Sequence, residues 1–110
     1  MKAKVEIDAG ICGFYTTACV TSEDGQNVVF NLDSNCDKIL QLGQVLQDKG
    51  PVDAYQEINP GGPAVIMTTV QESLKGCCAG CAVPVGLFKA MQVAAGLALP
   101  KDITIKLAKD

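Results

Sequence analysis

Residues 14–33 read FYTTACVTSEDGQNVVFNLD, and this stretch decides the fold. Its two ends are rich in β-branched and aromatic residues, which favour strands, and the Asp24-Gly25 pair between them is a strong turn signal. We therefore predict an antiparallel hairpin of residues 14–21 and 27–33. Residues 4–8 alternate polar and apolar side chains with a period of two, which predicts a half-buried strand before the hairpin.

Helical segments are expected after the hairpin. The first begins after three candidate N-cap residues, Asp33, Ser34 and Asn35, and ends at about Lys49, because Gly50 and Pro51 follow it. Residues 52–58 are expected to form a short helical turn before a Gly- and Pro-rich loop at 59–63. A second helix is predicted over 64–75, with Pro63 in its first turn. The third covers 83–99, with an apolar face of Leu87, Phe88, Met91, Ala95 and Leu99.

The C-terminal residues 101–109 return to strict alternation through Ile103, Ile105 and Leu107, so they are expected to form a fourth strand that pairs with residues 4–8. The whole chain of 110 residues is expected to form a single domain, residues 1–110. Its predicted class is α+β: a two-layer sandwich with a mainly antiparallel four-stranded sheet, in the order βββα(α)αβ, and helices on one face.

The composition excludes several functions. All nine basic residues are Lys, the chain has neither Arg nor His, and its net charge is −3. Nucleic-acid binding is therefore not expected, because it relies on clustered cations and on the planar fork of Arg. The lack of His also removes the usual general base and the imidazole ligand of mixed zinc sites.

Two segments of the sequence indicate in which cell compartment the protein lies and whether it crosses a membrane. Residues 1–8, MKAKVEID, contain no apolar signal-peptide core, so we expect a cytoplasmic protein with reduced thiols. Residues 83–99 are too few and too polar to cross a bilayer, so no membrane association is expected.

Six cysteines remain as the chemically distinctive residues. Residues 76–84 read GCCAGCAVP, in which Cys78 and Cys81 are spaced so that two thiolates can bind one ion. Cys81 lies near the start of the third predicted helix and Cys36 near the start of the first, where the helix dipole favours a thiolate.

A Cys-only centre is the main functional prediction. Its expected ligands are Cys36, Cys77, Cys78 and Cys81, with Cys12 as the next candidate beside the turn residue Gly13. Such a site could hold zinc or an iron–sulfur cluster, although the spacing matches no standard zinc ribbon or ferredoxin pattern. Cys19 lies inside the first hairpin strand, and alternation does not say which face of that strand is buried, so a role as a core residue stays open.

Two other functions remain open. The CCxxC segment could carry out thiol–disulfide exchange or persulfide relay, although it lacks the strand–CxxC–helix context of thioredoxin-like proteins. Alternatively, the thiols are inert and the domain is structural, binding an unidentified protein partner or a second copy as a homodimer. Neither catalysis nor a substrate follows from the sequence.

The segment GCCAGCAVP, the Ala-rich helix after it and the terminal KDITIKL resemble small Cys-rich proteins of methanogenic and related anaerobic archaea, grouped as a domain of unknown function. The resemblance covers nearly the whole chain. It implies an anaerobic cytoplasm in which iron–sulfur clusters and reduced thiols persist, and it implies no particular activity.

Overall fold

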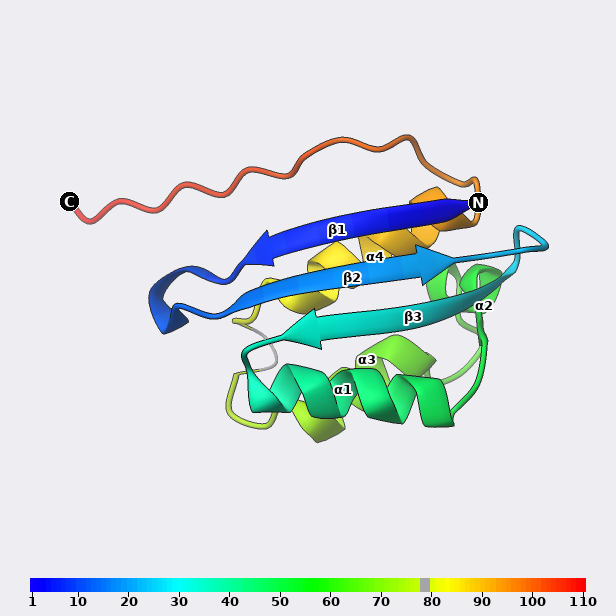
Figure 1. Cartoon of the computed structure of the whole chain (residues 1–110), viewed down its shortest axis with the longest axis horizontal. Coiled ribbons are helices and arrows are strands. Elements are labelled where there is room, and N and C mark those ends of the chain that lie inside the picture. Colours follow the sequence, from blue (N-terminus) through cyan, green and yellow to red (C-terminus); the bar gives the residue numbers. More distant parts are fainter. Residues whose placement is uncertain (78–79) are drawn as a thin grey trace.

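The computed structural model describes residues 1–77 and 80–110, and it contains a sheet with helices packed against it (Figure 1). The strands are β1 (Lys2–Asp8), β2 (Tyr15–Thr21), β3 (Asn27–Ser34) and β4 (Val52–Asp53). The helices are the 3-10 turn η1 (Gly10–Cys12), α1 (Asp37–Asp48), α2 (Ala54–Ile58), α3 (Val65–Ser73) and α4 (Val83–Ala94). All neighbouring strands are antiparallel in the order β1-β2-β3-β4, which confirms the predicted α+β class.

The predicted hairpin is confirmed. In β2, Thr16, Ala18 and Val20 are buried on the helix-covered side, and the residues between them are exposed or half-buried. The tight turn follows Asp24, whose Oδ1 accepts hydrogen bonds from the N–H groups of Gln26 at 2.9 Å and Asn27 at 2.7 Å. Gly25 has a φ of +75°, the left-handed conformation for which glycine is favoured.

Helix α1 is also confirmed, and it packs against β3 through Ile39, Leu42 and Leu46. It ends as expected, because Gly50 has a φ of +81° and Pro51 cannot continue the helix. Its start differs from the prediction. The N-cap is Cys36, which makes no side-chain capping bond.

The fourth strand is not the predicted one. Residues 52–58 form β4 and then α2, and β4 pairs with β3 through Asn27–Asp53 and Val28–Val52. The side chain of Asp53 caps α2 by accepting the N–H groups of Tyr55 at 3.0 Å and Gln56 at 3.4 Å. The predicted helical turn is therefore present, but a short edge strand precedes it.

The two later helices are shorter than predicted. Helix α3 begins at Val65, so Pro63 lies outside it, and α4 ends at Ala94. The N–H of Gly96, at a φ of +75°, donates to Val93 O at 3.0 Å, and that of Leu97 donates to Gln92 O at 2.8 Å. This pair of bonds is a Schellman motif, which ends a helix. The prediction of Leu99 as a core residue was wrong, because it lies beyond this stop and is 90% exposed.

The prediction that residues 101–109 form a strand paired with β1 was also wrong. The structure assigns no strand to this segment, here called the C-terminal tail (residues 101–110), and every residue in it is exposed. It leaves the body beside the N-terminal end of β1 and runs in the same direction as that strand (Figure 1). Alternation shows that a segment suits an edge of a sheet, but it does not identify the partner.

In the described part of the chain, no helix combines the length and the apolar character that crossing a membrane requires.

Candidate metal centre

Three connections of the fold lie at one end of the sheet, here called the cysteine pole. They are the link between β1 and β2, the junction of β3 with α1, and the connection between α3 and α4 (Figure 1). Cys12 lies in the first connection, Cys36 in the second, and Cys77 and Cys81 in the third. The antiparallel order of β1, β2 and β3 produces this meeting, because β1 and β3 both end at the edge where β2 begins.

Cys36 is fixed by the junction between β3 and α1. Its N–H donates to the Oγ of Ser34 at 3.1 Å, and the side chain is half-buried against the core. The neighbouring Asn35 joins the junction to β2, because its Oδ1 accepts the N–H of Tyr15 at 2.8 Å. The side chain of Cys36 forms no capping bond to α1 and therefore remains available to a ligand.

Backbone bonds hold Cys77 and Cys81 together. Gly76 has a φ of +91°, which turns the chain after α3, and the N–H of Cys81 donates to Cys77 O at 2.9 Å. The ammonium of Lys38, in the first turn of α1, donates to Lys75 O at 2.9 Å. This bond ties the connection between α3 and α4 to the helix that follows Cys36.

Cys12 ends the turn η1 and is exposed. Gly13, at a φ of +75°, follows it and donates its N–H to Gly10 O at 2.9 Å. The predicted turn between the first two strands is therefore present. The thiol of Cys12 points back toward Ala9 O, 3.9 Å away.

The surroundings of Cys81 raise the pKa of its thiol. Burial raises the pKa of Cys81, while the backbone N–H of Val83 lowers it. The negative charges that Cys77, Cys12 and Cys36 carry as thiolates raise the same pKa further. The prediction that a helix N-terminus tunes Cys81 toward its anionic form was therefore wrong for the metal-free protein, because burial and like charges outweigh the single N–H.

The described side chains do not form a finished ligand set. Among residues 1–77 and 80–110, no three Cys, Asp or Glu side chains are placed to bind one ion together. Cys78, the remaining predicted ligand, lies outside the described residues. The five described cysteines are free thiols, and soft sulfur donors without imidazole suit zinc or an iron–sulfur cluster.

Cys19 is not part of this pole, and its burial, which the sequence left open, is decided by the structure. It is exposed on the open face of the sheet, between Lys4 of β1 and Asn31 of β3. Strand alternation separates two faces but does not say which one the helices cover.

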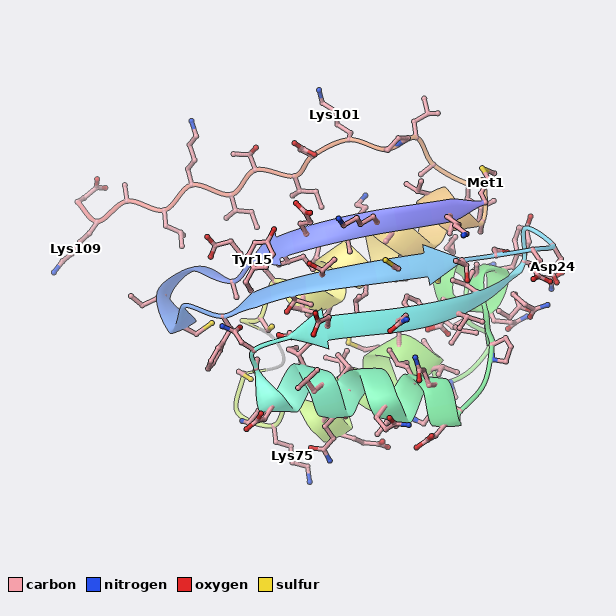
Figure 2. All side chains as sticks on the ribbon, viewed as in Figure 1. Met1, Tyr15, Asp24, Lys75, Lys101 and Lys109 are labelled. Atoms are coloured by element: carbon pink, nitrogen blue, oxygen red, sulfur yellow. The ribbon has the colours of Figure 1, made fainter. Side chains whose placement is uncertain are left out.

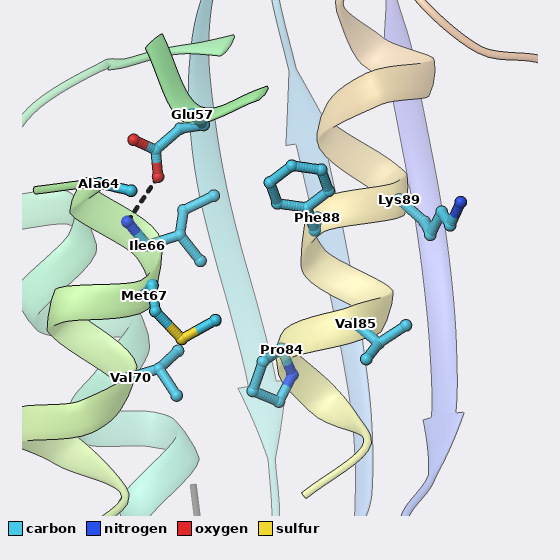
Figure 3. Close-up of a pocket in the computed structure, with 9 residues that line it drawn as sticks. All are labelled: Glu57, Ala64, Ile66, Met67, Val70, Pro84, Val85, Phe88 and Lys89. Carbon is cyan, nitrogen blue, oxygen red and sulfur yellow. Dashed lines mark hydrogen bonds between the residues drawn. The ribbon is translucent and has the colours of Figure 1, made fainter. Parts of the chain in front are cut away.

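A hollow that the sequence did not predict lies between α3 and α4 and has a volume of about 330 Å³ (Figure 3). Its walls are apolar apart from two charged residues. They are formed by Glu57, Ala64, Ile66, Met67, Val70, Pro84, Val85, Phe88 and Lys89.

Glu57, at one end of this hollow, is a buried acid with 5% of its surface exposed. Its carboxylate accepts the N–H groups of Val65 at 2.9 Å and Ile66 at 2.6 Å, and so caps α3. Figure 3 shows the bond from Ile66. Capping residues normally directly precede their helix, whereas Glu57 lies eight residues before Val65, so no local sequence signal reveals it. Because the carboxylate is engaged with α3, its role is structural.

No curated protein and no solved structure matches the chain. Residues 3–107 match the sequence model of a family of unknown function, DUF6951. This match includes residues 3–8 of β1, the cysteine pole, the helices described above and residues 101–107 of the C-terminal tail, and the chain therefore belongs to this family.

Proposed function

We propose that the protein binds a metal ion or an iron–sulfur cluster at the cysteine pole, through Cys36, Cys77, Cys78 and Cys81 with Cys12 beside them. The observation that carries the proposal is that the three connections holding Cys12, Cys36, and Cys77 with Cys81 lie at the same end of the sheet (Figure 1). The topology brings these connections to one end of the sheet, and a thiol in each of the three gives that end a set of soft sulfur donors.

The electrostatics favour a ligand over a reaction. A thiol that attacks a disulfide works as a thiolate, and a raised pKa reduces the thiolate fraction of Cys81 at neutral pH. A bound cation reverses this effect, since its positive charge stabilises all the surrounding thiolates together. Thiol exchange or persulfide relay is therefore the second candidate function.

The proposal includes the cellular environment of the protein. The resemblance to Cys-rich proteins of anaerobic archaea, and a cytoplasmic location, would both keep the thiols reduced and an iron–sulfur cluster intact. Zinc would need neither an anaerobic source nor a reducing cytoplasm, so the identity of the metal also tests this proposed environment.

The test is elemental analysis and a visible absorption spectrum on protein purified without oxygen, together with a count of titrating thiols. We expect stoichiometric iron with a visible chromophore, or stoichiometric zinc with masked thiols. Cys81→Ser should lose the metal, and Cys19→Ser is the matched control, because Cys19 lies on the open face of the sheet and should leave loading unchanged.

Two results would overturn the metal site. One is metal-free protein with six freely titrating thiols. The other is equal loading of the Cys81 and Cys19 variants, since this would place the metal elsewhere. Metal-free protein would favour the second candidate function, thiol exchange or persulfide relay, which disulfide-exchange kinetics of the same variants would test.

A further inference from the structure

The open edge of β1 is a feature that the proposed metal site does not use. β1 is the first strand in the order β1-β2-β3-β4, and within the described chain no strand pairs with its outer side. The edge is seven residues long, whereas the opposite edge strand, β4, has two. A long open edge is a template for another strand, and proteins usually cover or shorten it.

The C-terminal tail has the complementary property: it suits a strand but lacks a sheet. Ile103, Ile105 and Leu107 point to one side in an extended segment and are 51%, 70% and 95% exposed. The exposure rises along the tail because the chain moves away from its own body, and Figure 2 places Lys109 beyond the body and Lys101 near β1. The family match, residues 3–107, includes residues 3–8 of β1 and 101–107 of the tail, so this part of the tail belongs to the domain of the family.

The apolar side chains of the two segments match. On the helix-covered side of β1, Ile7 is buried while Ala3 and Val5 are only half-buried. A strand added beside β1 would place Ile103, Ile105 and Leu107 next to these three residues. Burial of these apolar side chains would favour the added strand, because it removes apolar surface from water.

Charge selects the direction of pairing. When the tail runs parallel to β1 with these apolar residues side by side, Asp102 lies beside Lys2 and Lys106 beside Glu6. In the antiparallel arrangement of the same residues, Asp102 lies beside Asp8 and Lys106 beside Lys4. Opposite charges on neighbouring strands stabilise a sheet and like charges destabilise it, so the parallel direction is favoured.

We propose that the C-terminal tail of one copy adds as a fifth strand, parallel to β1, to the sheet of a second copy, and that the exchange is reciprocal. The second copy is the occupant because the tail does not pair with its own β1 and becomes more exposed toward its end. Exchange of one element between identical chains is a common route to a dimer. The proposal is independent of the metal site, since no cysteine lies in the tail.

The test measures the molar mass of the full chain by light scattering under reducing conditions, which prevent disulfide dimers. We expect twice the 11.5 kDa of one chain. Ile105→Asp should reduce the mass to that of one chain, and Thr104→Asp is the matched control, because it adds the same charge one residue away on the other face of the strand. The tail contributes nothing to the buried core, so circular dichroism should show both variants folded.

Lysine cross-linking of a mixture of ¹⁵N-labelled and unlabelled protein identifies the contact. We expect cross-links from Lys106 of one isotope form to Lys4 of the other. A monomer overturns the proposal, and protected tail amides in that monomer would show that the tail closes on its own β1. A dimer that survives Ile105→Asp also overturns it, since another face would then hold the copies together. Metal content should be equal in all these forms, so failure here leaves the metal site unaffected.

Discussion

Glu57 shows how one buried side chain connects two parts of the chain that are distant in sequence. Its carboxylate accepts two N–H groups of α3, from Val65 and Ile66, inside the core. We expect Glu57→Ala to lower the free energy of unfolding by about 2–4 kcal/mol, because both N–H groups lose their acceptor and the helix loses its cap. Glu57→Gln keeps one acceptor oxygen and should lose less. Urea unfolding followed by far-UV circular dichroism measures both.

Glu72 provides the control for this prediction. It lies one residue before the end of the same helix, its side chain is 61% exposed, and its only described ion pair is to Lys49 at 3.8 Å. Exposed pairs contribute little, so Glu72→Ala should change the free energy of unfolding by no more than about 0.5 kcal/mol. Similar losses for the two alanine variants would contradict the capping role of Glu57.

Gly86 is a single residue that sets the distance between α4 and β1. A methyl group at this position would lie 2.5 Å from Cδ1 of Ile7 and 3.3 Å from Cγ2 of Val5. Gly86→Ala should therefore destabilise the protein by a net amount of about 1 kcal/mol, since overpacking of about 1–3 kcal/mol outweighs the better helix propensity of Ala. Ile7→Val removes the Cδ1 atom, so the double variant should recover part of the loss. A double-mutant cycle of unfolding free energies without coupling would contradict this contact.

At the scale of elements, the turn between β2 and β3 depends on an ionised Asp24. Hydrogen bonds from the side chain of Asn27 and from the backbone of Asn27 and Gln26 lower the pKa of Asp24 from 3.8 to about 2. A lowered pKa means that the contribution of Asp24 to stability is complete above about pH 4 and is lost as the pH falls toward 2. The difference in urea midpoint between wild type and Asp24→Ala should therefore shrink over this range. A carboxyl ¹³C titration giving an ordinary pKa for Asp24 would contradict the bonding pattern.

The elements that the sequence predicted are those whose signals are local. The hairpin follows from β-branched strands around Asp24-Gly25, and α1 from its apolar period and Gly50. The position of Cys12, Cys36 and Cys81 near one end of the sheet also has local causes, because turns and helix starts in an antiparallel fold lie at sheet ends, whereas the metal site itself stays a prediction. The features that the sequence did not predict depend on distant partners: strand β4 needs β3, and the covered face of β2 depends on which side the helices pack.

Across the whole molecule, the tail and the cysteine pole are separable units. The tail leaves beside the N-terminal end of β1, whereas the pole lies at the other end of that strand (Figure 1). Removal of residues 101–110 takes away only exposed side chains, so a single copy should keep its folded structure and its far-UV circular dichroism spectrum. Loss of the native spectrum in the truncated chain would show that the tail supports its own core.

The dependence of stability on protein concentration tests whether the exchanged strand contributes to folding. If two copies bury their tails in each other, unfolding also dissociates the dimer, so dilution destabilises the folded state. A tenfold dilution should remove about 1.4 kcal/mol per dimer, seen as a lower thermal midpoint. The chain without residues 101–110 should show a midpoint independent of concentration. The same concentration dependence in both chains would mean that copies associate through a surface other than the edge of β1, because the truncated chain has no strand to exchange.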